Sequence, residues 1–129
     1  MTTRAIQTSA APAAVASYSQ AIDTGQLVFL AGQIGLDPAT GQIVDGGIEA
    51  EAERALRNIM AVLDAAGLSM SDVVKTTCFL ADINDFASFN AVYAKFVAYP
   101  PPARSTFAVA ALPRGARIEI EAIAVRSDD

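Results

Sequence analysis

The chain has 129 residues, of which 53% are hydrophobic, and a formal net charge of −5 from 9 basic and 14 acidic side chains. It contains no histidine, which excludes Ser-His and Cys-His nucleophilic mechanisms and the common zinc sites. The acidic balance, with Lys75 and Lys95 far apart in the sequence, also argues against nucleic acid or an anionic membrane surface as a partner.

The length is typical of one domain, so we expect residues 1–129 to form a single unit. Cys78 is the one cysteine, so no intramolecular disulfide is expected, and the segment MTTRAIQTSAAP lacks the apolar stretch of a signal peptide. We therefore expect a reducing, cytoplasmic location. So high an apolar content in so small a domain also indicates that part of the surface meets another subunit.

The first third of the chain predicts short strands and then a loop. Strand-like runs occupy residues 18–23 and 26–31, with the turn pair Thr24-Gly25 between them, and a weaker run lies near residues 4–7. Residues 35–47 contain four glycines and a proline, which predicts a loop.

The middle of the chain alternates between helical and strand patterns. Between Ile48 and Ala66, apolar residues recur at spacings of three and four, which predicts a helix that ends at Gly67. Residues 72–81 are rich in β-branched side chains and predict a strand. A second helix is expected over residues 85–97, with Asn84 or Asp85 as its cap and with an apolar stripe at Phe86, Phe89, Tyr93, Phe96 and Val97.

Three prolines, residues 100–102, end that helix and hold the backbone extended. Two strands follow, over residues 104–110 and 116–125. The resulting order, β-β-β-α-β-α-β-β, predicts an α+β fold in which two helices cover one face of a mixed sheet. The other face has no helix left to cover it, which again points to oligomerisation.

Arg104 is the first candidate functional residue. Strand alternation places it on one face with Thr106, Ala108 and Ala110, and such small neighbours leave room for a ligand beside the guanidinium. Arginine binds carboxylates through two parallel hydrogen bonds, so the pattern suggests a carboxylate site. The alternative is an ordinary surface or salt-bridged arginine.

Glu119 and Glu121 form the second candidate, because alternation places both carboxylates on one strand face together with Arg117. One of them in a partly dry cleft would have a raised pKa and could transfer protons. The alternative is a charged rim in which Arg117 pairs with Glu119.

Three further side chains have both a structural and a functional interpretation. Asn90 interrupts the apolar stripe of the second helix, where a buried amide most often pins a loop but can also contact a site. Tyr18 begins a strand-like run and is more often a packing residue than a catalytic one. Cys78 is expected to be a small core residue without reactivity.

Taken together, the motifs resemble the RidA/YjgF family of reactive-imine deaminases. The matching segments run in order from about residue 15 to 126: YSQA, AGQI, GLDPATGQI, AAG, VKTT, DFASFN, PARS and IEIEA. The resemblance implies a chorismate-mutase-like α+β fold and a homotrimer with sheets facing inward and a site between protomers. It also implies hydrolysis of 2-iminobutanoate or 2-iminopropanoate to 2-keto acids and ammonia, which is hydrolase chemistry on a C–N bond other than a peptide bond, with no cofactor and no metal.

The resemblance assigns roles to individual positions. It implies that Arg104 binds the substrate carboxylate and that Glu119, rather than Glu121, activates water. Tyr18 is then a third catalytic residue, and the remaining substrate-binding positions are Asn90, Gly32, Ala31 and Thr106.

The sequence departs from the family pattern at several of these positions. Ala31 replaces a common serine, Thr106 replaces the cysteine of the best-studied branch, and Ala16-Ser17 replaces a common Gly-Pro. The segment formed by residues 97–102 is also shorter than the corresponding segment of that branch. These changes concern substrate preference and efficiency, because pocket walls set both.

Two other functions remain open at this point. A trimeric module that binds small carboxylates without turnover would fit the loss of the serine hydroxyl at Ala31. Endoribonuclease or translation-inhibitor activity ranks third, because the acidic charge and the lack of a basic patch disfavour RNA.

Overall fold

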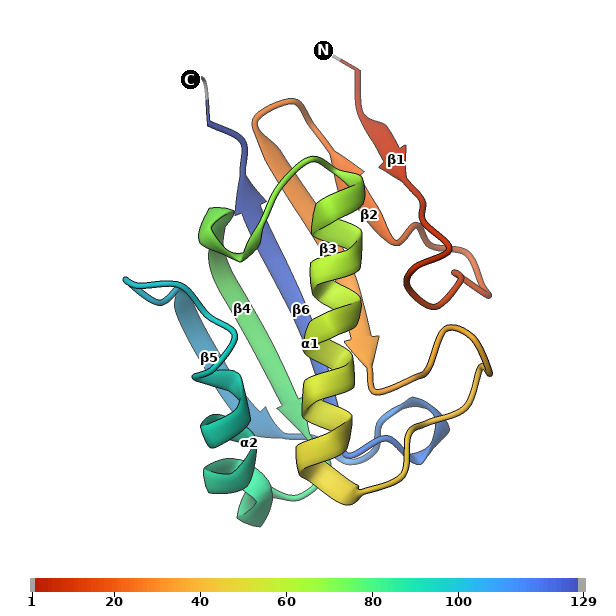
Figure 1. Ribbon diagram of the computed structural model, residues 1–129, viewed down its shortest axis with the longest axis vertical. Helices are drawn as coiled ribbons and strands as arrows, with labels where there is room; N and C mark the ends of the chain where they lie inside the picture. Colours follow the sequence, from red (N-terminus) through yellow and green to blue (C-terminus); the bar gives the residue numbers. More distant parts are fainter. Residues whose placement is uncertain (1, 128–129) are drawn as a thin grey trace.

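The computed structural model describes residues 2–127, which form one six-stranded sheet and two α-helices (Figure 1). The strands are β1 (Arg4–Ile6), β2 (Ala21–Asp23), β3 (Leu27–Ile34), β4 (Val73–Leu80), β5 (Ala103–Ala108) and β6 (Ile118–Val125). The α-helices are α1 (Gly47–Ala65) and α2 (Phe86–Tyr93), and three short 3₁₀ turns are η1 (Met70–Asp72), η2 (Ile83–Asp85) and η3 (Pro113–Gly115). The predicted order of strands and helices is confirmed.

The sheet is mixed, with the strand order β1-β2-β3-β6-β4-β5. Only β4 and β5 run parallel, and α2 lies in the connection between them. In this pair Thr76 lies opposite Arg104 and Cys78 lies opposite Thr106, whereas β4 and β6 pair antiparallel with Phe79 opposite Glu119. These registers determine which side chains share a face of the sheet.

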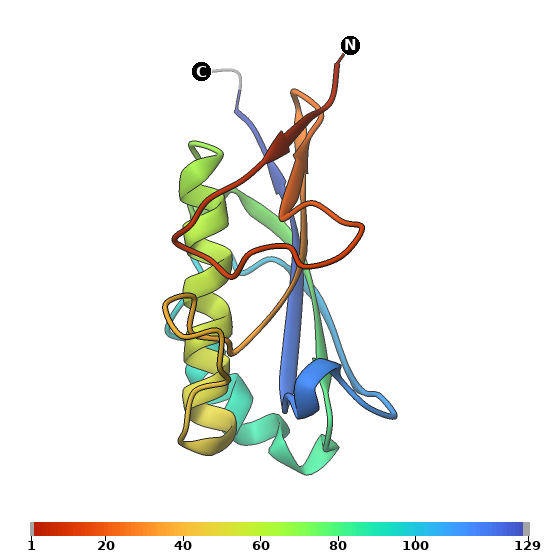
Figure 2. The same ribbon diagram turned by 90° about the vertical axis from the view of Figure 1, so that its right-hand side faces the viewer.

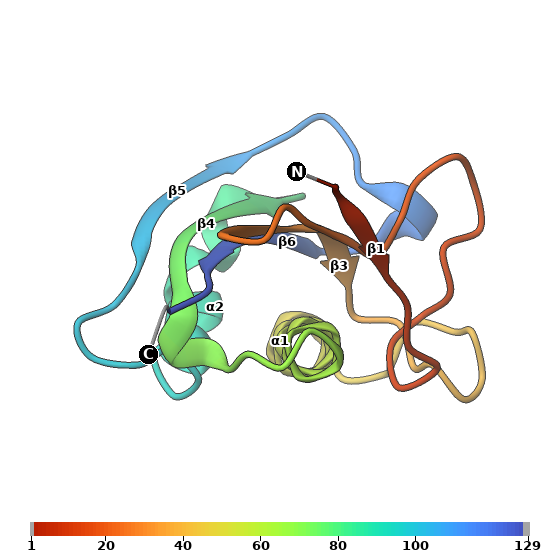
Figure 3. The ribbon, with the colours of Figure 1, turned by 90° about the horizontal axis from the view of Figure 1, so that it is seen from above.

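Both helices lie on the same side of the sheet, as Figures 2 and 3 show. The predicted stripe of α1 faces the sheet, and Ala52, Leu56, Ile59 and Leu63 are buried there. The helix ends where Gly67 adopts the left-handed backbone conformation, with φ of +76°. Within the described chain, no helix has the length and apolar character needed to cross a membrane.

Several predicted boundaries differ from those of the structure, and two of these differences have a clear physical reason. Residues 18–20 are not in a strand, because the Gln20 side chain bonds to the backbone of residues 8–12 and this segment leaves the sheet. The second helix ends at Tyr93 rather than at residue 97, because Lys95 and Phe96 donate their N–H groups to carbonyls only three residues back. The helix begins at Phe86 with Asp85, one of the two predicted caps, at the N-cap position, but the Asp85 side chain makes no capping hydrogen bond. Asp82 caps the preceding η2 turn by accepting the Asn84 N–H at 2.9 Å.

The other face of the sheet carries large apolar side chains without cover in this chain. Leu27 and Phe29 of β3 alternate with buried Val28 and Leu30, and they remain 37% and 43% exposed. Phe107 of β5 is 45% exposed on the same face and packs edge to face on Phe79. An apolar surface of this kind favours contact with another copy of the chain.

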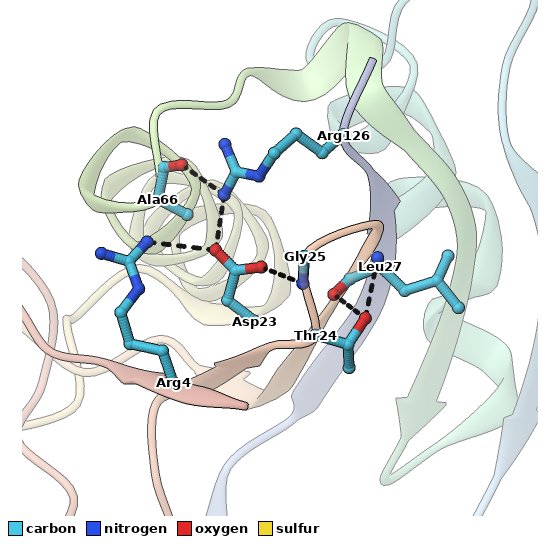
Figure 4. A network of polar contacts seen from close by, with 7 residues as sticks. All are labelled: Arg4, Asp23, Thr24, Gly25, Leu27, Ala66 and Arg126. Atoms are coloured by element: carbon cyan, nitrogen blue, oxygen red, sulfur yellow. Dashed lines mark hydrogen bonds and ion pairs between the residues drawn. The ribbon is translucent and has the colours of Figure 1, made fainter. Parts of the chain in front are cut away.

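A buried carboxylate joins the two ends of the chain to the sheet and to α1 (Figure 4). Asp23 Oδ2 accepts hydrogen bonds from Arg126 Nη2 at 2.7 Å and from Arg4 Nη2 at 3.1 Å, and Oδ1 accepts the Gly25 N–H at 2.8 Å. Arg126 Nη2 also donates to the Ala66 carbonyl at the end of α1, at 2.9 Å. The Gly25 N–H and, to a smaller extent, the two arginines lower the pKa of Asp23, although burial opposes the shift.

We predict that Asp23→Asn lowers the free energy of unfolding at pH 7 by about 1–3 kcal/mol. The substitution removes the negative charge that accepts hydrogen bonds from Arg4, Gly25 and Arg126. The pKa of Asp23 is lower in the folded protein than in the unfolded chain. The charge of Asp23 therefore stabilises the fold at any pH above the ordinary aspartate pKa. This stabilisation is lost as the pH falls through the pKa of Asp23 in the folded protein.

Urea denaturation at fixed protein concentration, from pH 7 down to pH 3, measures this difference. The matched control is Glu53→Gln, which breaks the exposed Glu53–Arg57 pair and should cost less than about 0.5 kcal/mol. An Asp23→Asn deficit that does not shrink towards acid pH would contradict the prediction.

Candidate active site

Arg104 lies on the helix-covered side of the sheet, on the edge strand β5. Its Nη1 donates a hydrogen bond of 2.8 Å to Asn90 Oδ1 on α2. Its Cζ lies 4.7 Å from the centre of the Tyr93 ring and 5.5 Å and 5.9 Å from the Phe86 and Phe89 rings. Within residues 2–127, no acidic side chain forms an ion pair with Arg104. The guanidinium is thus fixed in place while its charge remains uncompensated.

A cavity of about 560 Å³ adjoins this guanidinium. Asn90 and Tyr93 of α2 line one part of it, and Pro101 and Pro102 line another. The proline run therefore forms a wall beside Arg104 as well as leading the chain into β5. Asn90, for which pinning a loop was the favoured interpretation, instead holds Arg104 at the edge of a cavity.

Glu119 lies on the opposite, helix-free side of the sheet. Its neighbours Ile118 and Ile120 on β6 are fully buried against the helices, so alternation directs Glu119 the other way. The side chain is half-buried, and this burial raises the pKa of its carboxyl, with a further contribution from the charge of Glu121. Arg117, the neutralising partner in the alternative interpretation, pairs instead with Glu51 of α1 at 3.4 Å.

A second cavity, of about 400 Å³, contains Glu119. Tyr18, Ala31 and Gly32 line it, together with Arg114 of the η3 turn. The remaining lining residues are mostly apolar: Pro12, Ala13, Val15, Gln33, Ile34, Leu36 and Pro113. A carboxyl group in such surroundings loses hydration, which agrees with the upward shift of its pKa.

Gly32 makes room for the Glu119 carboxyl. A Cβ added at Gly32 would collide with Glu119 Oε2 and would lie 2.8 Å from its Cδ. The carboxyl group therefore lies directly over the backbone of β3, and it can keep this position only while residue 32 has no Cβ, since no unusual backbone angle requires the glycine.

Two buried amides that the sequence analysis missed hold the walls of this cavity. Asn58 of α1 is fully buried, and its Nδ2 donates to the carbonyls of Ile34 and Leu36 at 3.1 Å and 2.9 Å. The Gln20 Oε1 accepts the Thr8 N–H at 2.7 Å, and its Nε2 donates to the carbonyls of Thr8 and Pro12. A polar residue within an apolar helical face was the available signal for Asn58.

The predicted site residues thus separate into two groups within one protomer. Arg104, Asn90 and Thr106 lie on the helix side, whereas Glu119 lies on the other side with Tyr18, Ala31 and Gly32. The two cavities share no lining residue. Arg104 and Glu119 therefore do not share a cavity within one chain, because strand alternation directs the two side chains to opposite faces of the sheet.

Thr106 and Cys78 lie opposite each other in the β4–β5 register. The Thr106 hydroxyl is buried and has no hydrogen-bond partner among the described residues. Cys78 is fully buried, and burial raises the pKa of its thiol to about 11, so it is not a nucleophile at neutral pH.

Taken together, the fold and the two cavities define a small α+β protein with an uncompensated guanidinium beside one cavity and a half-buried carboxyl group in the other. The model of the family described as Endoribonuclease L-PSP matches residues 8–126. The chain is 50% identical over 123 residues to the mouse protein named 2-iminobutanoate/2-iminopropanoate deaminase, with 95% of this chain and 91% of the mouse protein covered. It is 51% identical over 127 residues to the DfrA protein of Myxococcus xanthus, with 97% of each covered.

Solved structures give the same result. RidA from an Antarctic Psychrobacter superimposes with a TM-score of 0.92 at 46% identity and covers 95% of this chain and 99% of its own. Escherichia coli TdcF with bound serine superimposes with a TM-score of 0.91 at 44% identity, and the match covers 96% of this chain and 99% of TdcF. This chain belongs to the Endoribonuclease L-PSP family, which is the RidA/YjgF family, as its motifs predict.

We predict that Glu119 titrates above the ordinary glutamate pKa and that Glu121→Gln lowers its pKa part of the way back. Burial, the larger cause of the shift, remains in this variant, whereas the like charge is removed. Carboxyl-detected NMR titration measures both values. The control is Glu53→Gln on the exposed face of α1, which should leave the Glu119 titration unchanged, and an unshifted Glu119 in the wild type would contradict the prediction.

Proposed function

We propose that this protein is a 2-iminobutanoate/2-iminopropanoate deaminase that hydrolyses 2-imino acids to 2-keto acids and ammonia. Relatives of about 50% identity over nearly the whole chain have this name. The structural observation that carries the proposal is the uncompensated guanidinium of Arg104 at the edge of a cavity. A 2-imino acid has a carboxylate next to its reacting carbon, so a fixed cation supplies both binding and orientation.

Arg104 holds the substrate carboxylate through the parallel hydrogen bonds that a guanidinium fork provides. Its Nη1 is occupied by Asn90, which leaves the rest of the fork for the ligand. Because no acidic side chain competes for the charge among residues 2–127, the full attraction is available to an anion. Each hydrogen bond to a charged group contributes about 1.5–3 kcal/mol.

Glu119 acts as the general base and general acid of the hydrolysis. Water attacks the imine carbon while its proton passes to the Glu119 carboxylate, which delivers it to the imine nitrogen, and a neutral carbinolamine forms. Glu119 then takes the hydroxyl proton of the carbinolamine and transfers it to the amino nitrogen, so that the C–N bond breaks, the keto C=O forms, ammonia leaves and the Glu119 carboxylate is restored. A raised pKa suits this double role, because a group that titrates nearer neutrality both accepts and donates protons efficiently.

The complete site requires two protomers. Arg104 and Glu119 face opposite sides of their own sheet, so one substrate can meet both only when a second copy supplies one of them. The exposed apolar side chains on the helix-free face, among them Phe29 and Phe107, support contact between sheets of different copies. We propose a homotrimer with the sheets facing inward and with one site in each cleft between protomers.

The other predicted residues complete the two halves of the site. Tyr18 lies in the Glu119 cavity, where its hydroxyl can assist proton transfer, and Ala31 and Gly32 form the adjacent wall. Thr106 lies on the same strand face as Arg104, and its buried hydroxyl has no partner in the described part of the chain, but it lines neither cavity of the single protomer. A free buried Cys78 agrees with action in the cytoplasm, where thiols stay reduced.

The second candidate is a module that binds small carboxylates without turnover. The observation in its favour is Ala31, which lines the Glu119 cavity without the hydroxyl that is common in the family. It predicts saturable binding of 2-oxobutyrate and no ammonia release. Endoribonuclease activity is not favoured, because the net charge of −5 would repel RNA.

We predict that Arg104→Ala raises KM for the imine at least about tenfold, because it removes the carboxylate anchor. Glu119→Gln should lower kcat about 10²–10⁴-fold with a smaller change in KM, because it removes the proton acceptor. In the assay, a threonine dehydratase generates the imine in the same reaction mixture, and the rate at which the imine disappears is measured. Arg57→Ala, an arginine that stacks on Phe96 away from both cavities, is the matched control and should behave as wild type. If the wild-type protein gave the same rate as buffer, the deaminase proposal would be rejected.

We further predict that Gly32→Ala lowers kcat at least about tenfold while the protein stays folded. The added Cβ occupies the place of Glu119 Oε2, so the carboxyl group must move away from its position over β3. Circular dichroism and thermal melting check the fold, and the imine assay checks the rate. Wild-type kcat in a folded Gly32→Ala variant would show that the position of the Glu119 carboxyl does not matter.

A further inference from the structure

Two buried hydroxyls lie beneath Arg104, and the reaction as derived above does not use them. Thr76 Oγ1 and Tyr93 Oη form a hydrogen bond of 2.7 Å, and the two residues are only 2% and 4% exposed. Burial raises the pKa of the Tyr93 hydroxyl, so it remains protonated and able to donate at neutral pH. This pair joins β4 to α2 across the interior of the protein.

The same two residues contact Arg104 from two directions. Thr76 is the residue opposite Arg104 in the parallel register of β4 and β5. The Tyr93 ring is the aromatic group nearest to the guanidinium, at 4.7 Å, compared with 5.5 Å for Phe86 and 5.9 Å for Phe89. The hydrogen bond to Thr76 therefore fixes the orientation of the ring face against which Arg104 lies.

A neutral ring has a different effect on a cation from that of a carboxylate. A carboxylate at this position would orient Arg104 but would also neutralise it and compete with an anionic ligand. The face of an aromatic ring attracts a guanidinium through its quadrupole and leaves the net charge in place. Asn90 Oδ1, which accepts the hydrogen bond from Arg104 Nη1, is likewise uncharged.

We propose that Tyr93, held by Thr76, is a positioning residue that fixes the Arg104 guanidinium without neutralising it. The ring sets where the guanidinium lies, and the Thr76–Tyr93 hydrogen bond sets where the ring lies. As far as it concerns substrate binding, this inference rests on the proposed deaminase function, whereas the ordering of Arg104 is a property of the free protein.

Kinetics of three variants test the effect on substrate. Tyr93→Leu removes the ring face and should raise KM about tenfold with kcat within about twofold, because Glu119 lies in the other cavity. Tyr93→Phe keeps the ring but leaves the Thr76 hydroxyl unpaired, and it should raise KM about two- to threefold and lower the melting temperature. The double variant Thr76→Val with Tyr93→Phe removes both hydroxyls and should regain most of the lost stability, while KM stays raised.

The double variant separates positioning from stability. If its KM returned to the wild-type value together with its melting temperature, the hydroxyl pair would serve stability alone and the proposal would be overturned. The matched control is Phe96→Leu, which removes the comparable contact between Arg57 and Phe96 at 5.4 Å and should leave KM unchanged.

A second measurement does not depend on any substrate. The Arg104 Nε–H signal, assigned by its loss in Arg104→Lys, reports the order of the guanidinium through its ¹⁵N heteronuclear NOE. We expect an ordered signal in the wild type, reduced order in the double variant, and a larger loss in Tyr93→Leu if that variant folds. Unchanged order in the folded double variant would overturn the proposal. A wild-type protein without deaminase activity but with this pattern of order would refute the proposed function and leave the positioning role supported.

Discussion

Strand alternation in the central sheet is the constraint on which the rest of the structure depends. It directs Arg104 towards α2 and Glu119 towards the helix-free face, so the cation and the carboxyl group of one chain cannot neutralise each other. Each group keeps the property that its chemistry needs: Arg104 has no charged partner among the described residues, and Glu119 has a raised pKa. The same separation leaves each chain with two half-sites, which is why the proposed reaction requires assembly.

Uncharged groups hold both Arg104 and Glu119 in position. Asn90 and Tyr93 hold Arg104 without contributing charge, and Gly32 clears the space in which the Glu119 carboxyl lies. The amides of Asn58 and Gln20 fix the cavity walls by bonding to backbone carbonyls. The buried carboxylates that form ion pairs, Asp23 in the network that ties the ends of the chain together (Figure 4) and Glu51 in its pair with Arg117, line neither cavity.

The sequence predicted the order of the elements and the covered and open faces, because periods of two and of three to four residues are local properties of the chain. Alternation also identified Arg104 and the pair Glu119 and Glu121 as candidates, and the family resemblance selected Glu119 from the pair. The sequence could not predict that Arg104 and Glu119 lie apart, since the face of β5 depends on its register with β4 and on the aromatic side chains of α2. The partner of Arg117 was missed for a similar reason, because Glu51 is 66 residues away in the chain. The Thr76–Tyr93 bond joins two elements in the same way, and neither residue has a local pattern that reveals it.

Complementation between two variants, each impaired in one half of the proposed site, tests the shared site most directly. Arg104→Ala and Glu119→Gln chains are unfolded together, refolded at equal amounts, checked for mixed oligomers by native mass spectrometry, and assayed well below the wild-type KM, where each variant alone has little activity. In a trimer with sites between protomers, every mixed ring has one junction at which an intact Arg104 meets an intact Glu119, so about a quarter of all sites should recover. Verified mixed trimers with no more activity than the separate variants would contradict a site built from two protomers.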